Sequence, residues 1–219
     1  MIANELISAE LIPLRTSDTG NDSLKIMNEF SIRHLPIVNN TQLLGVISEE
    51  EILSQDPFEA VGSYSLSLNP SFVNIDDHLF DIMRIMAESN LTVIPVVDGE
   101  ENYVGLISLE KLLHFFAKSF TFSERGSIIV LDVPRSDYSL QEISGIIEME
   151  DAIILAVFLN SKSDSNSIQV SLKVNKQETR AAVASLERYK YKVSAVFSEP
   201  VYFETLQHRY DELMKYLSI

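Results

Sequence analysis

The stretch that decides the fold is HLPIV at residues 34–38, because it recurs as VIPVV at residues 93–97, 59 positions later. A second stretch, LGVIS at 44–48, recurs as VGLIS at 104–108, 60 positions later. The extra residue falls in the polar run between the two stretches, where insertions are tolerated. Self-similarity at a fixed period is the signature of a structural repeat. The first half of the chain is therefore predicted to hold two copies of one unit.

Each copy has the same predicted order of elements. An amphipathic helix pattern covers residues 21–30 in the first copy and 77–89 in the second. The two quoted apolar runs follow, with a polar turn between them, which indicates a β-hairpin. A second helix is predicted at 49–54 and at 109–117. The repeated unit is thus helix–strand–strand–helix.

The second half of the chain has a different pattern of apolar and polar residues. Its apolar patterning predicts the order strand, helix, strand, strand, helix, strand, at residues 127–133, 139–150, 152–159, 168–174, 177–189 and 192–197. This βαββαβ order is the ferredoxin-like arrangement. A final helix is predicted at 202–217, with a broad apolar face that should pack on its own domain or on a partner subunit. The predicted fold class is α+β.

Composition excludes several classes of protein. The formal net charge is -15 over 219 residues, and the basic residues form no cluster, so binding to nucleic acid or to an anionic membrane surface is not expected. The absence of Cys rules out disulfides, thiolate metal sites and cysteine nucleophiles. The N-terminus has no secretory pattern, and no apolar stretch of the sequence approaches the roughly 20 residues that a membrane helix needs. The expected location is the cytoplasm.

The repeated motif resembles the CBS domain, a family whose members commonly occur as tandem pairs. The helix, the LPIV or IPVV strand, the GVIS or GLIS strand and the acidic helix carry the resemblance, over about residues 10–118. The expected domains are residues 1–60 and 61–120 for the two repeats and 126–219 for an ACT-like domain. The order of domains is similar to that of acetoin-utilisation-type regulatory proteins.

The resemblance implies a regulatory ligand of the adenosine type, such as AMP, ADP, ATP or S-adenosylmethionine. The family motif is Gly-x-x-Ser/Thr-x-x-Asp, whose hydroxyl and helix N-terminus suit a phosphate and whose carboxylate suits a ribose. In the first repeat Ser48 fits, and Glu51 replaces the Asp. In the second repeat Ser108 fits, and Lys111 stands where the carboxylate should be. The Ser48–Glu51 cleft is therefore the preferred site on sequence alone.

Arg33 and His34 are the best cationic candidates for this cleft, because they precede the first strand core of the first repeat. Each candidate also has a structural interpretation. Ser48 and Ser108 are suited to capping the helices that follow them. Arg33 is equally suited to a solvent-exposed edge. The sequence leaves these alternatives open.

No motif for catalysis or metal binding is present in the sequence. The four His residues have no metal-ligand spacing, and the sequence has neither a nucleophile elbow nor a phosphate-binding Gly-rich loop. We therefore expect a non-catalytic regulatory protein, with a ligand-free dimerisation scaffold as the alternative. The resemblance implies a homodimer. The ACT-like domain is expected to dimerise rather than to bind an amino acid, because its loop at 134–139 has no Gly.

Overall fold

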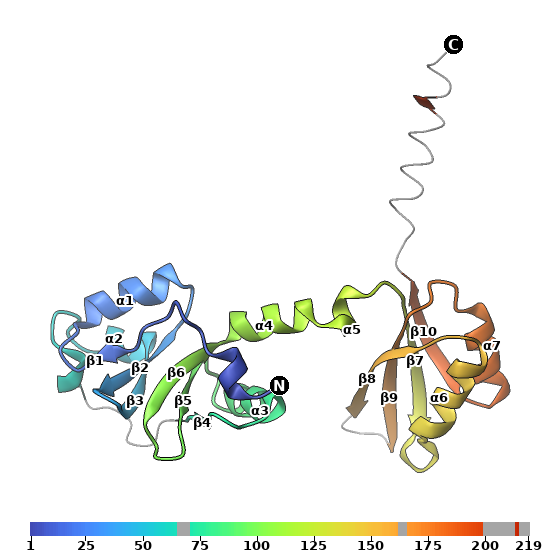
Figure 1. Cartoon of the computed structure of the whole chain (residues 1–219), viewed down its shortest axis with the longest axis horizontal. Coiled ribbons are helices and arrows are strands. Elements are labelled where there is room, and N and C mark those ends of the chain that lie inside the picture. Colours follow the sequence, from blue (N-terminus) through green and yellow to red (C-terminus); the bar gives the residue numbers. More distant parts are fainter. Residues whose placement is uncertain (65–70, 162–165, 199–212, 215–219) are drawn as a thin grey trace. The chain divides into compact units, whose positions relative to one another are not determined.

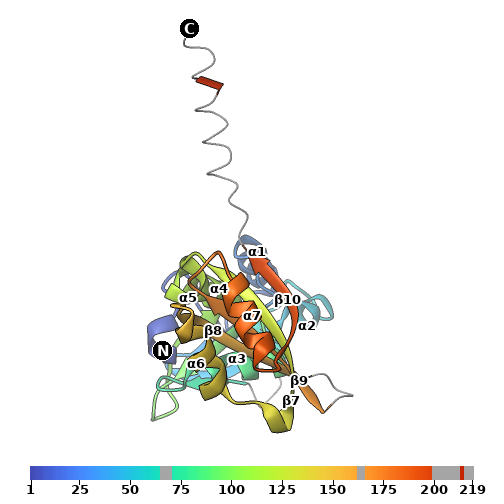
Figure 2. The ribbon, with the colours of Figure 1, turned by 90° about the vertical axis from the view of Figure 1, so that its right-hand side faces the viewer.

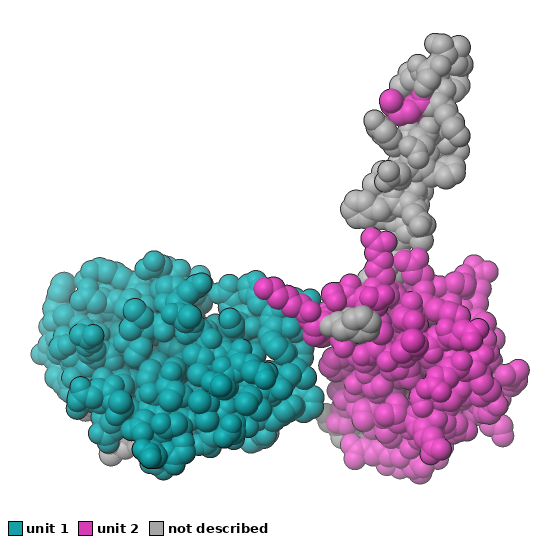
Figure 3. All heavy atoms as spheres, in the orientation of Figure 1, with its two compact units in different colours: residues 1–117 teal, residues 118–219 magenta. Residues whose placement is uncertain are grey.

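The chain forms two compact units in the computed structural model, Met1–Ala117 and Lys118–Ile219 (Figure 1 and Figure 3). The structure describes residues 1–64, 71–161, 166–198 and 213–214. The helix expected at 202–217 therefore falls outside the described residues, apart from residues 213 and 214.

The first unit contains both copies of the repeat. The first copy comprises η1 (Ala3–Leu6), β1 (Leu14–Arg15), α1 (Gly20–Glu29), β2 (His34–Asn39), β3 (Gln42–Ser48), α2 (Glu49–Leu53) and η2 (Val61–Ser63). The second comprises β4 (Val73–Asn74), α3 (Leu79–Glu88), β5 (Val93–Val97), β6 (Tyr103–Ser108) and α4 (Leu109–Lys118). Their sheets have the orders β1-β2-β3 and β4-β5-β6. The predicted helix–strand–strand–helix order is confirmed, with a short parallel strand added before each first helix.

The two copies agree in detail that goes beyond the order of elements. The hairpins pair His34 with Ser48 and Val93 with Ser108, so each serine ends its strand at the same register. Helices α1 and α3 are each followed by a residue in the left-handed region, Ser31 with φ 52° and Asn90 with φ 51°. A left-handed residue is a common way to end a helix. The backbone has therefore been conserved between the copies at its turns.

The two copies share their cores. Val93 and Leu106 belong to the second copy, yet both are fully buried in the core that surrounds Leu35 and Ile47 of the first. The opposite exchange occurs at the start of the chain, where Leu6 of η1, in the first copy, is buried in the core of the second copy. Each exchange removes apolar surface from water only when both copies are folded. The pair therefore forms one folding unit.

The second unit has the βαββαβ order that the sequence predicts. After α5 (Phe120–Ser123) come β7 (Ser127–Pro134), η3 (Arg135–Asp137), α6 (Leu140–Met149), β8 (Ile154–Ser161), β9 (Ser167–Val174), α7 (Arg180–Arg188) and β10 (Lys192–Ser198). The strands form one antiparallel sheet in the order β10-β7-β9-β8. Helices α6 and α7 cover one face of it (Figure 1 and Figure 2). The core lies between these helices and the sheet.

Candidate ligand site at the strand–helix junctions

The candidate residues lie at two equivalent junctions, where the last strand of each copy passes into the next helix. Ser48 ends β3 before α2, and Ser108 ends β6 before α4. In each copy the first amide of the helix donates to the carbonyl of the residue just before the first strand of the hairpin: Glu49 N to Arg33 O at 2.9 Å, and Leu109 N to Thr92 O at 3.0 Å. The two junctions thus share the same backbone hydrogen bond at equivalent positions of the repeat.

A hydrogen-bond cluster between Arg33, His34 and Thr92 joins the two junctions. The backbone amide of Arg33 donates to the Thr92 hydroxyl at 2.9 Å, and the Thr92 amide donates to His34 Nδ1 at 3.2 Å. The Thr92 hydroxyl also lies 3.1 Å from Nδ1. Because Nδ1 accepts from an amide, the neutral ring carries its proton on Nε2. The cluster therefore requires neutral His34.

Sequence reasoning missed Thr92, although the repeat contains the signal for it. Thr92 is 59 positions after Arg33, so the two residues hold the same place in their copies. The strands that follow these two residues, β2 and β5, contact each other, so the two equivalent positions come together. Thr92 is uncharged and belongs to no ligand motif, so its position in the repeat alone could have indicated it as the partner of Arg33 and His34.

The environment of His34 favours the neutral ring. Burial lowers the pKa of His34 below its usual 6.5, because the charged ring would lose its hydration, and the neighbouring Arg33 cation lowers the pKa further. The carboxylates of Glu51 and Glu50 act in the opposite direction with less effect. The electrostatics and the hydrogen-bond geometry therefore agree.

The first junction is closed by its own side chains. The amide and the hydroxyl of Ser48 both donate to Glu51 Oε2, each at 2.7 Å. The Glu51 amide donates back to the Ser48 hydroxyl at 3.2 Å, which completes a capping box. The expected donor and the expected acceptor of a ligand are thus each other's partners. The N-capping interpretation of Ser48 describes this geometry, and its role toward a ligand stays a prediction.

The second junction has the same cap without the carboxylate. The Ser108 hydroxyl accepts from the Lys111 amide at 3.1 Å, and the Ser108 residue is only 6% exposed. Within the described part of the chain, its hydroxyl hydrogen has no acceptor. The Lys111 ammonium is exposed and likewise has no ion pair among the described residues. This junction therefore keeps one hydroxyl donor and one cation available.

Arg33 supplies a further exposed cation near the first junction. Its side chain makes no ion pair with any residue that the structure describes, and only its backbone joins the Thr92 cluster. The structure thus pairs His34 at the start of β2 with Ser48 at the end of β3, and Arg33 directly precedes β2. Ser108 lies at the equivalent end of the second hairpin, and Lys111 follows one turn into α4.

Among the described residues, no group of three or more His, Cys, Asp or Glu side chains is placed to hold a metal ion. No described helix has the length and apolar character needed to cross a bilayer.

Comparison with protein families identifies the repeated unit. The model of the CBS domain matches residues 3–56 and again residues 61–118, which together make up just over half of the chain. Among curated proteins, an uncharacterised protein of Methanocaldococcus jannaschii is 29% identical over 106 residues, covering 48% of this chain and 40% of the relative. The chain spans less than half the length of the first curated relatives that it matches.

Solved structures that are similar include a CBS domain pair/ACT domain protein from Thermotoga maritima. It is 21% identical, with a TM-score of 0.48, and the match covers 55% of this chain and 99% of that one. CBSX2 in complex with AMP is 20% identical, with a TM-score of 0.46 and coverages of 53% and 96%. A CBS domain pair in complex with 5′-methylthioadenosine and S-adenosyl-L-methionine is 23% identical, with a TM-score of 0.45 and coverages of 53% and 99%.

Proposed function

The chain belongs to the CBS domain family, and on this basis we propose that it is a non-catalytic regulatory protein whose CBS pair binds an adenosine-type ligand. The candidates are AMP, ADP, ATP and S-adenosylmethionine, the first and last of which are bound in the similar structures named above. The two repeats are residues 1–60 and 61–120. The ligand changes the geometry of a dimer by binding one of its states more tightly than the other.

The observation that carries this proposal is the unused hydroxyl hydrogen of Ser108. A buried hydroxyl that donates to nothing is costly, and a ligand oxygen would satisfy it. Ser108 also precedes α4, and the positive end of that helix dipole favours a phosphate group, while the Leu109 and Lys111 amides already donate to Thr92 O and Ser108 Oγ. We therefore place the ligand's phosphate, or the carboxylate of S-adenosylmethionine, at Ser108 and Lys111. This reverses the preference that the sequence alone gives to Ser48 and Glu51.

The first junction is the poorer phosphate site for a physical reason. Glu51 already occupies the Ser48 hydroxyl and amide, so a ligand would have to displace a carboxylate. Glu49, Glu50 and Glu51 would also repel a phosphate. Arg33 and His34 remain candidates for the other end of the ligand, because they lie beside the Thr92 cluster that joins the two copies.

A thermal-shift screen of the whole chain tests the proposal. AMP, ADP, ATP and S-adenosylmethionine are each added at a series of concentrations, with sodium chloride matched for ionic strength. A ligand that binds only the folded state stabilises it by about 2.7 kcal/mol at 100 times its dissociation constant. We expect at least one of the four to raise the midpoint. No shift with any of them would contradict the ligand-binding proposal.

A ligand-free dimerisation scaffold is the second candidate function. The closed capping box favours it, because the Ser48 hydroxyl and the Glu51 carboxylate already bind each other. The scaffold and the sensor make opposite predictions in the thermal-shift screen. The scaffold predicts a midpoint that depends on protein concentration and on none of the four ligands.

We propose that both functions use a homodimer, formed through the outer face of α3 and α4. This face has a cavity of about 520 Å³ lined mainly by apolar side chains, including Met83, Met86, Leu112 and Phe116. Leu109 and Leu113 on its rim are 55% and 69% exposed. Contiguous apolar surface of this kind is characteristic of interaction sites. A second copy of the same face, related by a twofold axis, would cover it.

Matched charge substitutions in the two repeats test this dimer. Leu113→Glu places a carboxylate on the proposed interface, and Leu53→Glu does the same at the equivalent position of the first repeat, where Leu53 is 64% exposed. Because we also assign dimerisation to residues 126–219, the comparison uses the compact unit Met1–Ala117. Light scattering should show monomers for Leu113→Glu and dimers for Leu53→Glu. Dimers in both variants, or a monomeric unsubstituted chain, would exclude this face as the interface.

We further propose that residues 126–219 form an ACT-like domain of the kind found in acetoin-utilisation-type regulatory proteins. Its support is the βαββαβ order and the antiparallel sheet β10-β7-β9-β8. The loop between β7 and α6 contains η3 and no Gly, which makes close backbone approach by an amino acid less favourable there. Dimerisation is the role we assign to this domain. Its separate expression and light scattering would test that role.

A further inference from the structure

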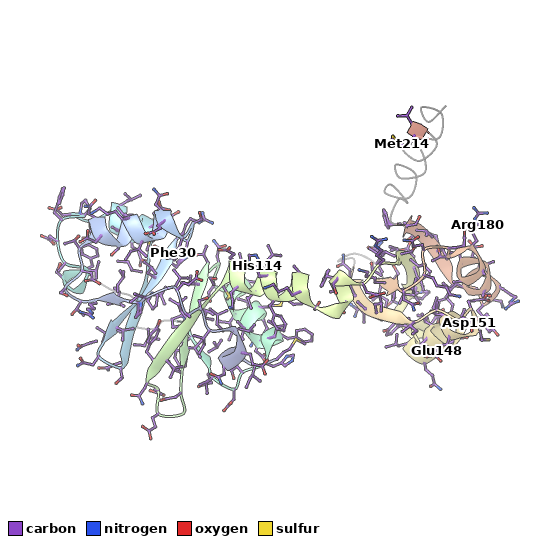
Figure 4. All side chains as sticks on the ribbon, turned by 45° about the horizontal axis from the view of Figure 1, so that its top comes forward. Phe30, His114, Glu148, Asp151, Arg180 and Met214 are labelled. Atoms are coloured by element: carbon purple, nitrogen blue, oxygen red, sulfur yellow. The ribbon has the colours of Figure 1, made fainter. Side chains whose placement is uncertain are left out.

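The second unit contains a cavity far from the loop between β7 and α6. Its volume is about 500 Å³, within the usual range for small-molecule sites. It lies where α6 ends and α7 begins, and Asp151, Lys176, Thr179 and Ala182 line it. Helix α6 starts after that loop and ends at Met149, so the cavity is at the opposite end of the sheet. Asp151 and Arg180, labelled in Figure 4, mark the two helix ends.

The N-terminus of α7 has no cap from its own side chain. Thr179 holds the N-cap position but makes no capping hydrogen bond, in contrast to Ser139, which caps α6 by accepting from the Glu142 amide at 3.2 Å. Thr179 is only 6% exposed, and no described residue hydrogen-bonds its hydroxyl. Among the described residues the fully enclosed side-chain oxygen without a partner is Tyr103 Oη, so the Thr179 hydroxyl keeps some accessible surface. Because this nearly buried residue lines the cavity, its unpartnered hydroxyl is open to a molecule bound there, and this is the observation that points to a ligand.

The backbone of α7 adds donors around this hydroxyl. The first amides of a helix have no acceptor within the helix. Of these in α7, the Arg180 amide donates to Glu178 Oε1 at 3.0 Å. The amides of Ala181 and Ala182 are left without an acceptor among the described residues, and both residues line the cavity. The nine-residue helix therefore directs two amides and the positive end of its dipole toward one place.

Lys176 completes the set of donors. Its ammonium donates to the Glu150 carbonyl at 2.6 Å, which holds the half-buried side chain against the end of α6. An ammonium has three hydrogens, so two remain for a ligand. The other charged residues on the cavity wall are Glu150, Asp151 and Glu178. These three carboxylates disfavour a dianion more than a single negative charge.

We propose that this cavity binds a small molecule through one carboxylate group. The carboxylate accepts hydrogen bonds from the Thr179 hydroxyl, from the free α7 amides and from Lys176. A phosphate dianion would be repelled by the surrounding acidic residues. The site is separate from the junctions of the CBS pair, and it requires neither an adenosine-type ligand nor the ACT-like assignment.

An NMR titration of the whole chain tests the proposal, with sodium acetate as the probe. Backbone amide signals of Thr179, Ala181 and Ala182 should move along saturable curves as acetate is added, and sodium chloride at equal ionic strength should not move them. Sodium phosphate should produce smaller changes at equal concentration. The α6 N-terminus is the internal control, because Ser139 already caps it. Shifts that do not saturate, or equal shifts at both helix N-termini, would overturn the proposal.

Matched variants identify the groups that bind. Thr179→Val removes the hydroxyl with little change of shape, and Lys176→Gln removes the cation. Each should weaken acetate binding by about threefold to tenfold, the usual effect of one hydrogen bond. Arg180→Gln removes the same charge from the same region, from a side chain that is 92% exposed and outside the cavity lining, and should leave binding unchanged. Equal weakening in Arg180→Gln and Lys176→Gln would reduce the effect to general electrostatics and contradict the site.

Discussion

The two CBS repeats have nearly the same backbone and different chemistry at equivalent positions. Each has a hairpin that ends in a serine, and each serine caps the following helix. In the first repeat that serine is bound by the Glu51 carboxylate, whereas in the second the equivalent residue is the exposed Lys111. One side-chain change therefore converts a self-satisfied cap into a junction with a free donor and a free cation.

The exposed helix faces of the two repeats also differ in polarity. The outer face of α3 and α4 is apolar, with Phe80 and Met83 68% and 41% exposed. The equivalent positions on α1 are Asn21 and Leu24, where the asparagine makes the face more polar. Duplication has thus kept the caps and turns that build the fold, while surface residues have diverged. The second repeat carries the features that we associate with a ligand and a partner.

The largest expected difference between equivalent positions is in the shared core. Leu106 of β6 is fully buried in the core of the first repeat, whereas Val46 at the equivalent place in β3 is only half-buried. Leu106→Ala should lower the free energy of unfolding by about 2–5 kcal/mol. Val46→Ala should lower it by about 1 kcal/mol. Urea unfolding followed by circular dichroism measures both, and equal losses would contradict the crossing of the cores.

The next difference concerns the capping box. Glu51→Ala removes the acceptor of the Ser48 amide and hydroxyl and should cost about 0.5–2 kcal/mol of unfolding free energy. Lys111→Ala, at the matched position, removes no hydrogen bond of its side chain and should change that free energy by less than about 0.5 kcal/mol. The same unfolding experiment compares them. A larger loss for Lys111→Ala would show that the first junction is not held as described.

A pH-dependent difference arises because His34 occupies the position of Val93 in the second repeat. The folded-state pKa of His34 lies below the usual 6.5, so the unfolded chain takes up the proton first as pH falls. The contribution to stability is present above pH 6.5 and is lost below it, down to the lowered pKa. The thermal midpoint of the chain should therefore fall more steeply below pH 6.5 than that of His34→Asn, which keeps an acceptor for the Thr92 amide. Parallel pH profiles would argue against the cluster.

The smallest expected difference lies at the helix ends. Ser31 and Asn90 both have left-handed backbones, but asparagine tolerates this conformation better than serine does. Ser31→Gly should raise the free energy of unfolding by about 0.5–1 kcal/mol, and Asn90→Gly by a few tenths. Denaturant midpoints with an unchanged slope would establish the order. A larger gain for Asn90→Gly would show that the two helix ends are not equivalent.

Much of the fold follows from the sequence, because the repeat fixes two hairpins and four helices at once. The strands β1 and β4 escape prediction, since two residues are too few to show a period. The crossing of Val93 and Leu106 into the first core also escapes it, because an apolar residue does not indicate which neighbour will bury it. These are properties of tertiary packing.

The sequence predicts most of the residues of the candidate site but not the hydrogen bonds that they make with one another. Sequence patterns indicate Ser48 and Glu51 as ligand groups and also allow Ser48 as a cap, and only geometry shows that the two bind each other. Thr92 and Thr179 have no motif of their own. The first is found by its contact with His34, and the second by the hydrogen bond that it does not make.

Isothermal titration calorimetry of the ligand found in the thermal-shift screen tests the central claim most directly. The claim predicts one ligand per chain, at the second junction. Affinity should fall in Ser108→Ala and Lys111→Gln and remain in Ser48→Ala, although each serine variant loses a helix cap. Two ligands per chain, or binding that is lost in Ser48→Ala and kept in Ser108→Ala, would contradict the assignment of the ligand to the second repeat.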